Sequence, residues 1–564
     1  MFYREGFIGV GIVVQNETGH CLACRSFRIL QKLGPEVAEA LAAKFAMELA
    51  SEKQWSRIVL EGDCLSVVKK INSTDEDLST TGPIIADIKR TLRDFSWFRV
   101  NFIHMIGTKG NLEQDTTNPP WKRSFPHVIV ATLVAFLFGY HLGVVNEPLE
   151  TISVDLGFSG NSLEEGLVVS TLLAGAFGGS IFSGRIADDV GRRKAFQLCA
   201  LPMLLGASIC ATTTNLAGML LGRFLVGTGL GVGPPVASLY VTEVSPAHVR
   251  GTYGSFIQIA SCLGLLGSLL IGIPVSSVVG WWRICFWVST IPAAMLVLLM
   301  MFCAESPHWL YKQGRIAEAE LELERLVGSS HVKAAMVELS KTERADEIDT
   351  VKLTELLYGR HSRVIFIGST LFALQQLSGI NAVFYFSSTV FRRAGVSSNL
   401  GNVFVGVTNF TGSIIALGLM DKLGRKALLL WSFSGMALAM VLQVLAAAIP
   451  VSNPFAFYLS ISGMLLFVLM FAVGAGPVPS LLLPEIFPSR IRATAMAFCM
   501  SVHWVLNFLV GLLFLPLLDN MGPRLLYSMF CTFCLMAVVF VKRNVLETKG
   551  KSLQEIEIAL LPQE

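Results

Sequence analysis

Twelve apolar stretches, each about 20 residues long, fill this chain from residue 121 onward. A helix of about 20 apolar residues is long enough to cross the ~30 Å hydrocarbon core of a bilayer. The stretches lie at 127–146, 167–187, 195–213, 217–239, 253–274, 284–303, 363–388, 402–420, 427–449, 457–482, 494–518 and 524–541. Charged residues make up only 15% of the chain, against about 25% in a typical soluble domain. We therefore predict a polytopic membrane protein and exclude disordered, coiled-coil, collagen-like and disulfide-scaffold classes.

Basic residues fall on alternate loops of this series. Arg192 and Arg193 follow the second stretch and Arg425 and Lys426 follow the eighth, whereas 427–489 contains no Lys or Arg. Cytoplasmic loops carry an excess of Lys and Arg. We expect both termini and the hydrophilic central loop to face the cytosol or its equivalent, with six spans on either side of that loop.

The two sets of six spans repeat each other. Asp188 and Asp421, after the second and eighth spans, are 233 positions apart, and the run from Glu243 to Arg250 recurs 242 positions later as Glu485 to Arg492. A carboxylate beside a guanidinium can tie neighbouring helices together, and a bridge that breaks when the halves move would favour one conformation. Loop charges that only set the topology are the alternative.

Several motifs resemble those of the major facilitator superfamily, specifically its sugar porter family. They are Gly222-Arg223, Glu305-Ser306-Pro307, Gln375-Gln376-Leu-Ser-Gly-Ile-Asn381 and Glu547-Thr548-Lys549-Gly550. Within that family the chain is most similar to the plant plastidic glucose transporters, also at Phe138–Asn146. The resemblance implies an all-α, 12-helix (6+6) fold and alternating access around a midplane site. It assigns these residues to conformational salt-bridge clusters: Asp188, Arg192, Arg223, Glu243, Arg250, Glu305, Asp421, Arg425, Glu485 and Arg492.

Carboxamides and aromatic rings within the spans are the candidate sugar contacts. A carboxamide both donates and accepts hydrogen bonds, as sugar hydroxyls require, and aromatic rings suit the apolar face of a sugar. Polar groups are costly in a membrane, although some act only to join helices. With the resemblance, the candidate substrate-binding residues are Gln258, Gln375, Gln376, Asn381, Tyr385, Asn409, His503 and Asn507.

The chain departs from many sugar porters at positions that affect substrate and coupling. Ser480 and Ala472 stand where many members have Trp and Glu. His141 matches the Asp of proton-coupled members; it is either a proton site, since imidazole titrates near pH 6.5, or a structural or sugar-contacting residue. Glu147 is either an exposed loop acid or a second proton site. We favour facilitated diffusion.

Residues 1–118 read as a separate α/β segment. Strands are expected at 7–14, 20–27 and 57–60, and helices at 36–49 and 64–71. The segment resembles the RNase H-like domain of plant reverse-transcriptase-derived proteins, in which Glu39, Asp63 and Asp115 would match ligands of a two-metal site. The acid of the first strand is missing, so we predict a truncated, inactive segment or a fusion in the gene model.

The predicted organisation is therefore an RNase H-like segment (1–118), a six-helix bundle (119–303), a cytosolic-side helical loop (304–362), a second six-helix bundle (363–541) and a tail (542–564). The expected function is transport of glucose or a similar hexose, without enzyme activity, metal or cofactor. The expected partners are the sugar and the lipid bilayer, with no nucleic acid, and the chain is expected to be a monomer. Localisation in the plastid inner envelope is expected by resemblance, although no transit peptide is visible. A proton-coupled symporter, a membrane-tethered nuclease and a non-transporting sugar sensor are the alternatives.

Overall fold

The computed structural model divides the chain into two compact units, Met1–Thr116 and Thr117–Glu564. The residues that it describes are 2–4, 7–15, 21–29, 35–53, 55, 57–62, 65–73, 81–102, 119–246, 248–333, 335–337, 339–340, 362–393, 398–450, 454–487 and 491–549.

The first unit contains two small sheets. Strands β1 (Phe2–Arg4), β2 (Phe7–Gln15) and β3 (Cys21–Ile29) form an antiparallel sheet in that order, and β4 (Arg57–Gly62) pairs in parallel with β5 (Trp97–Phe102). A parallel pair needs a crossover connection, which the chain provides with two helices between β4 and β5.

Three helices complete this unit: α1 (Pro35–Glu52), α2 (Leu65–Asn72) and α3 (Gly82–Leu92). Their buried core includes Met47, Val67, Ile85 and Ile88, together with Val100 of β5. The strands expected at 7–14, 20–27 and 57–60 and the helices expected at 36–49 and 64–71 are confirmed, each within a few residues. The sequence analysis did not anticipate β1, α3 or β5.

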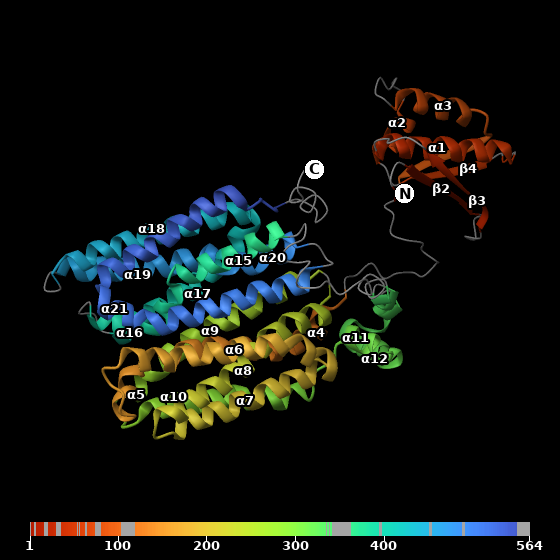
Figure 1. The fold of residues 1–564 in the computed structure, drawn as a ribbon. Coiled ribbons are helices and arrows are strands. Elements are labelled where there is room, and N and C mark those ends of the chain that lie inside the picture. The colour runs from red at the N-terminus through yellow and green to blue at the C-terminus, as the bar shows by residue number, and fades with distance from the viewer. Residues whose placement is uncertain are drawn as a thin grey trace. The chain divides into compact units, whose positions relative to one another are not determined.

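The second unit begins with the N-terminal bundle, orange to yellow-green in Figure 1. Its long helices are α4 (Trp121–Gly143), α6 (Ser162–Val190), α7 (Arg192–Thr212), α8 (Leu216–Val244), α9 (Arg250–Val275) and α10 (Trp281–Met300), with the short α5 (Leu149–Asp155) after α4. Helices α11 (Pro307–Lys312) and α12 (Ile316–Val327) and the 3₁₀ turn η1 (Ser329–His331) follow. We call the end of the bundle that carries α11, α12 and Arg192 the basic end, and the opposite one the far end.

The C-terminal bundle contains three interrupted helices. Its elements are α15 (Ser362–Leu377), α16 (Ile380–Arg393), α17 (Ser398–Leu423), α18 (Arg425–Ala448), α19 (Pro454–Met470), the π-helical segment η2 (Phe471–Ala475), α20 (Pro477–Ile486) and α21 (Arg492–Asn544). Gly379, with φ of 89°, separates α15 from α16. Within α21, Gly522 has φ of 75° and interrupts the helix.

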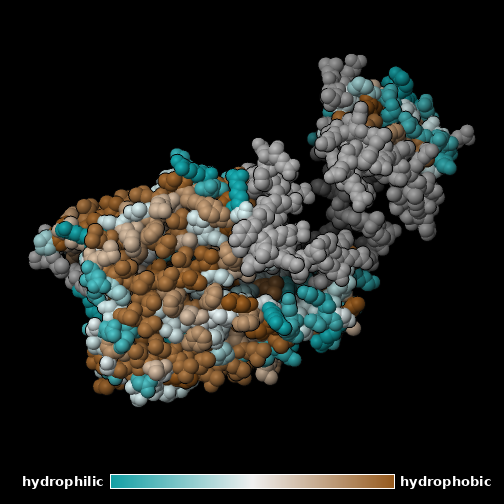
Figure 2. Space-filling view, viewed as in Figure 1, coloured by the Kyte–Doolittle hydropathy of each residue, from teal (hydrophilic) through white to brown (hydrophobic). Residues whose placement is uncertain are grey.

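Eleven helices among the described residues are long and apolar enough to cross a membrane. The last of them, Thr494–Asn544, is 51 residues long and holds two spans, because Gly522 divides it. The prediction of a 12-span membrane protein is therefore confirmed. Hydrophobic residues cover much of the flank of the second unit in Figure 2. Large apolar side chains such as Phe182 and Trp431 are exposed.

Glycines allow helices to approach closely both within and between the bundles. A Cβ atom at Gly139 of α4 would lie 1.8 Å from the carbonyl oxygen of Ser261 of α9. A Cβ atom at Gly166 of α6 would lie 2.5 Å from the carbonyl oxygen of Leu512 of α21. The second contact joins the two bundles near the far end, where α6 begins.

Candidate functional site

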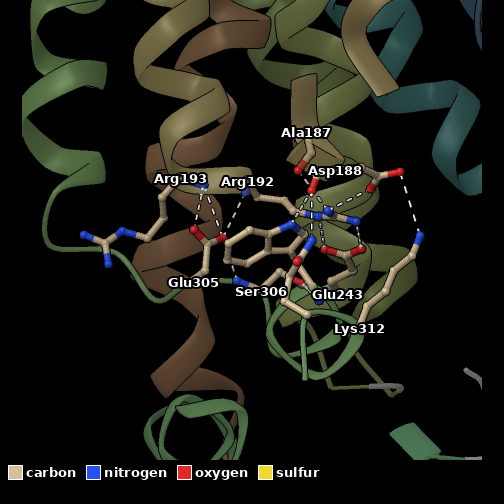
Figure 3. Close-up of polar contacts among 10 residues, drawn as sticks. Ala187, Asp188, Arg192, Arg193, Glu243, Glu305, Ser306 and Lys312 are labelled. Carbon is tan, nitrogen blue, oxygen red and sulfur yellow. Dashed lines mark hydrogen bonds and ion pairs between the residues drawn. The ribbon is translucent and has the colours of Figure 1, made fainter. Parts of the chain in front are cut away.

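Arg192 is the centre of a charge cluster at the basic end of the N-terminal bundle (Figure 3). Its Nε and Nη2 donate to both carboxylate oxygens of Glu243 on α8, at 2.9 and 2.8 Å. Its Nη1 donates to the Oδ1 of Asp188 at 3.1 Å and to the carbonyl of Ala187 at 3.0 Å. Such bidentate, charge-assisted bonds are strong, so Arg192 ties α6, α7 and α8 together.

Glu305 caps the first turn of α7 in the same cluster. Its carboxylate accepts from the backbone N–H groups of Arg192 at 3.0 Å, Arg193 at 3.3 Å and Ser306 at 2.9 Å. A carboxylate is favoured at a helix N-terminus. Burial nevertheless raises the pKa of Glu305, and the backbone N–H bonds oppose that rise. Gly191, with φ of 87°, leaves room for this carboxylate, since a Cβ there would lie 2.9 Å from its Oε2.

The C-terminal bundle contains a looser version of this cluster. Arg425 donates through Nη2 to the Oε1 of Glu485 at 2.9 Å, and among the described residues its Nε has no hydrogen-bond partner. Thr548 donates its hydroxyl to the other oxygen of Glu485 at 2.6 Å. Glu547 accepts from the backbone N–H groups of Arg425 at 2.9 Å, Lys426 at 3.0 Å and Lys549 at 3.0 Å.

Glu305 and Glu547 are thus equivalent, which the sequence analysis missed. They are 242 positions apart, the spacing that also separates Glu243 from Glu485, so the signal was present. Each cluster joins helices of one bundle, and the bonds described here do not cross between bundles. The side chains of Asp421 and Arg492 lie outside the described residues, and Arg250 is exposed at the start of α9.

Arg223 lies apart from both clusters, buried within α8. Its Nε donates to the carbonyl of Val168 and its Nη1 to that of His141, both at 3.1 Å. In the described part of the chain it forms no ion pair. Both ring nitrogens of His141 are buried and lack a hydrogen-bond partner among the described residues.

Four polar side chains of the C-terminal bundle form a continuous chain of hydrogen bonds. Gln375 donates to the carbonyl of Ala475 at 2.6 Å. Gln376 donates to the Oε1 of Gln375 at 3.1 Å and bonds the Nδ1 of His503 at 3.0 Å. Asn381 donates to the Oε1 of Gln376.

The direction of this chain is fixed, because a backbone carbonyl can only accept. The amide nitrogen of Gln375 must face Ala475, which leaves its oxygen for Gln376. The amide nitrogen of Gln376 then faces His503, whose Nδ1 must accept and whose proton lies on Nε2. The amide nitrogen of Asn381 is also used, and its oxygen remains as an acceptor.

The accepting carbonyl belongs to the end of the π-helical segment η2. Ser432 of α18 bonds both sides of this segment, donating to the carbonyl of Met470 at 2.6 Å and accepting from the N–H of Ala475 at 2.8 Å. π-Helical turns occur often at functional sites. The residue four positions after Ala475 is Pro479, which has no backbone N–H, so the Ala475 carbonyl is left for Gln375.

The remaining candidates lie on four helices, α9, α16, α17 and α21. The hydroxyl of Tyr385 donates to the Oδ1 of Asn507 at 3.1 Å. Gln258 of α9 is exposed although it lies within a span, and Asn409 of α17 is buried. The amides of both donate to the sulfur of Cys262, at 3.7 and 3.5 Å, a residue that the sequence analysis did not select.

Glu147 belongs to a polar network that joins the bundles at the far end. Its Oε2 accepts from the amide of Asn402 at 2.5 Å and from the hydroxyl of Ser388. The neighbouring Asn146 donates to the hydroxyl of Ser387 at 2.7 Å and accepts from the N–H of Ser388 at 3.0 Å. Glu147 is therefore half-buried, not the exposed loop acid that we considered.

Two pseudo-repeated helical bundles with polar groups along their shared interface define a multi-pass membrane transporter of the major facilitator fold. Residues 127–560 match the family described as "Sugar (and other) transporter". The chain belongs to this sugar transporter family, as the motifs predicted, and it is a transporter rather than an enzyme.

Named relatives and solved structures agree with this assignment. The chain is 73% identical over 451 residues to "Probable plastidic glucose transporter 2" of Arabidopsis thaliana, covering 80% of this chain and 92% of that protein. It is 44% identical over 436 residues to "Plastidic glucose transporter 4" of the same plant, covering 77% and 80%. The inward-open structure of the xylose transporter XylE from E. coli superposes with a TM-score of 0.68 at 27% identity, covering 78% and 100%.

The first unit has a different relationship. Residues 4–107 match the family described as "Reverse transcriptase-like", in agreement with the resemblance noted for this segment. The side chains of Glu39, Asp63 and Asp115 lie outside the described residues.

Proposed function

We propose that this transporter carries glucose or a similar hexose by facilitated diffusion across the inner envelope of a plastid. The names of its Arabidopsis relatives support the substrate and the organelle. The sugar would bind between the bundles at Gln258, Gln375, Gln376, Asn381, Tyr385, Asn409, His503 and Asn507. The protein would act as a monomer and without a cofactor.

The observation that carries the proposal of facilitated diffusion is the environment of Arg223. A carboxylate near the bilayer midplane can carry a proton, because it alternates between a charged and a neutral form. Here Arg223 is bonded to the carbonyls of His141 and Val168, and the first span offers His141 where a carboxylate would be needed. Arg223 would then stabilise the bundle without being neutralised in each cycle.

Proton-coupled transport is the second candidate, and Glu147 is the observation that favours it. This half-buried carboxylate of the N-terminal bundle bonds to Asn402 and Ser388 of the C-terminal bundle. Protonation would remove the negative charge of Glu147 and part of its acceptor capacity, and would weaken that contact.

Uptake of labelled glucose by the full chain in proteoliposomes separates these candidates. Facilitated diffusion predicts uptake that equilibrates without concentrating the sugar and is indifferent to an imposed pH gradient. Asn381→Ala should raise KM, because it removes the oxygen left for a ligand. Accumulation driven by the gradient would refute the proposal, and loss of accumulation in Glu147→Gln or in His141→Ala would identify the proton site. Absence of uptake for any hexose would favour a sensor.

We also propose that the reverse-transcriptase-like unit is inactive as a nuclease and binds no nucleic acid. The proposal rests on the absence of Asp and Glu from strands β1 and β2, since two-metal hydrolysis needs a full set of carboxylates. Mg²⁺-dependent cleavage of an RNA–DNA hybrid by the full chain, lost in Asp63→Asn, would contradict it.

A further inference from the structure

Cys262 lies where the two bundles meet in the middle of the fifth span. It is one helical turn from Gln258 on α9 and is 3% exposed. Helix α17 of the other bundle approaches α9 closely here, since a Cβ at Gly406 would lie 2.8 Å from the side chain of Leu266. The thiol is therefore placed between groups of both bundles.

The hydrogen bonds around this thiol have a defined direction. The hydroxyl of Ser413 donates to the carbonyl of Asn409 at 2.9 Å, so its single proton is used. The contact of 3.1 Å between Ser413 and Cys262 is then a bond from the thiol to the hydroxyl oxygen. The sulfur itself accepts from the amides of Gln258 at 3.7 Å and Asn409 at 3.5 Å.

Sulfur is a weak acceptor, whereas a sugar hydroxyl is a strong one. Amides that donate to sulfur are oriented by that contact. They lose little hydrogen-bond energy when they exchange the sulfur for a hydroxyl oxygen. Gln258 belongs to the N-terminal bundle and Asn409 to the C-terminal one, so one atom orients a donor from each.

We propose that Cys262 is a substrate-positioning residue: its sulfur orients the amides of Gln258 and Asn409 in the empty site and releases them to the hydroxyls of the sugar. This inference rests on the proposed function, because it assumes that these two amides contact the sugar. Cys262 would have this role although it contributes no strong hydrogen bond of its own.

The test compares Cys262→Ser with Cys262→Ala in the full chain, by measuring KM and maximal rate for labelled glucose in proteoliposomes. The hydroxyl introduced by Cys262→Ser is a strong acceptor and competes with the sugar for the two amides. The KM of Cys262→Ser should rise about fivefold, the effect of one net hydrogen bond, with an unchanged maximal rate. Cys262→Ala offers no acceptor and leaves the amides of Gln258 and Asn409 unoriented, so its KM should also rise, but by less than that of Cys262→Ser.

Two controls distinguish positioning from packing. Cys199→Ser changes a buried thiol that donates to the carbonyl of Phe196 in its own helix, and its KM should not change. In an Asn409→Ala background, Cys262→Ser should raise KM less than it does in the otherwise wild-type chain, because one of the two amides is gone.

The remaining outcomes overturn the inference. If alanine raises KM more than serine does, Cys262 only fills space; if all three proteins have the same KM, its sulfur does not compete with the sugar. In both cases the wild type still transports, so the proposed function stands. If the wild type takes up no hexose, both proposals fail together.

Discussion

The charge clusters at the basic ends of the two bundles have the same plan but different strength. In the N-terminal bundle, Arg192 forms four bonds through its guanidinium and its side chain is 6% exposed. In the C-terminal bundle, Arg425 is 20% exposed and bonds one oxygen of Glu485. Duplication of a sequence motif therefore preserved the position of each charge but not the number of its partners.

The capping carboxylates differ in the same direction. Burial raises the pKa of Glu305. Burial also acts on Glu547, but the backbone N–H groups of Lys549, Arg425 and Lys426 outweigh it and hold its pKa below the usual range. The ion pair of Arg192 with Glu243 is thus more deeply buried than that of Arg425 with Glu485, and the C-terminal cluster is completed by a tail segment. We expect the two bundles to respond differently to matched substitutions.

The largest effect is expected for Glu243→Gln. It removes the charge that neutralises a buried guanidinium, which costs about 3 kcal/mol. The loss should appear as a lower midpoint of thermal unfolding in detergent. A midpoint within a degree of the wild type would show that Asp188 alone satisfies Arg192.

Gly191→Ala should have the next largest effect. A residue with a side chain is strained at φ of 87°, by about 1–3 kcal/mol, and the added Cβ would lie 3.1 Å from the ring of Trp309. For the matched Gly424→Ala, the three atoms nearest to the added Cβ all belong to the carboxyl group of Glu547, the closest at 2.6 Å, and the end of this flexible side chain can move. Unfolding midpoints should therefore fall in both variants, and further in Gly191→Ala.

Glu485→Gln should lower the free energy of unfolding less than Glu243→Gln does in the other bundle. Its partner Arg425 is partly exposed, and such pairs contribute about 1 kcal/mol or less. Thr548 can still donate to the remaining carbonyl oxygen. An unfolding midpoint as low as that of Glu243→Gln would show that the clusters are equally strong and would refute the comparison.

The smallest effect concerns pH, and its sign differs between the bundles. Because the pKa of Glu547 is lowered on folding, its contribution to stability is present at neutral pH and is lost as the pH falls through that pKa. Because the pKa of Glu305 is raised, protonation on acidification favours the folded state. The unfolding midpoint of each variant is compared with that of the wild type at pH 7 and at pH 4. The advantage of the wild type over Glu547→Gln should become smaller at pH 4. Its midpoint relative to that of Glu305→Gln should instead rise at pH 4.

If the midpoint difference from the wild type changes with pH equally in Glu547→Gln and Glu305→Gln, the two capping carboxylates are equivalent. The exposed ion pair between Lys44 and Asp87 in the first unit provides a control, since Asp87→Asn should leave both pH dependences unchanged.

The fold followed from the sequence because the bilayer permits few solutions. A stretch of about 20 apolar residues must form a helix, since its backbone groups have no other partners in lipid. The same reasoning placed the break at Gly522 between the stretches 494–518 and 524–541, but not the one at Gly379, because a single glycine within an apolar run is compatible with a continuous helix. The strand β1 was missed because three residues are too few to show a period. The helix α3 could have been found, since Ile85, Ile88 and Leu92 have helical spacing, and so could β5, in which apolar residues alternate with Arg99 and Asn101.

The candidate site was only partly accessible to sequence reasoning. Carboxamides within spans stand out as costly residues, so Gln375 and Asn409 could be selected directly. Cys262 could not, since cysteine is an ordinary apolar packing residue until its neighbours are known. The bonds of Glu147 to Ser388 and Asn402 depend on how the two bundles meet, which no local pattern encodes.

The close approach of Gly166 to Leu512 has a practical consequence for trapping the transporter. These residues belong to different bundles, and the absence of a side chain at 166 is what lets α6 and α21 touch near the far end. A methyl group introduced by Gly166→Ala would act as a wedge between the bundles. It would disfavour the arrangement described here and raise the population of one that opens at the far end. The variant would thus provide a means of crystallising the opposite half of the transport cycle.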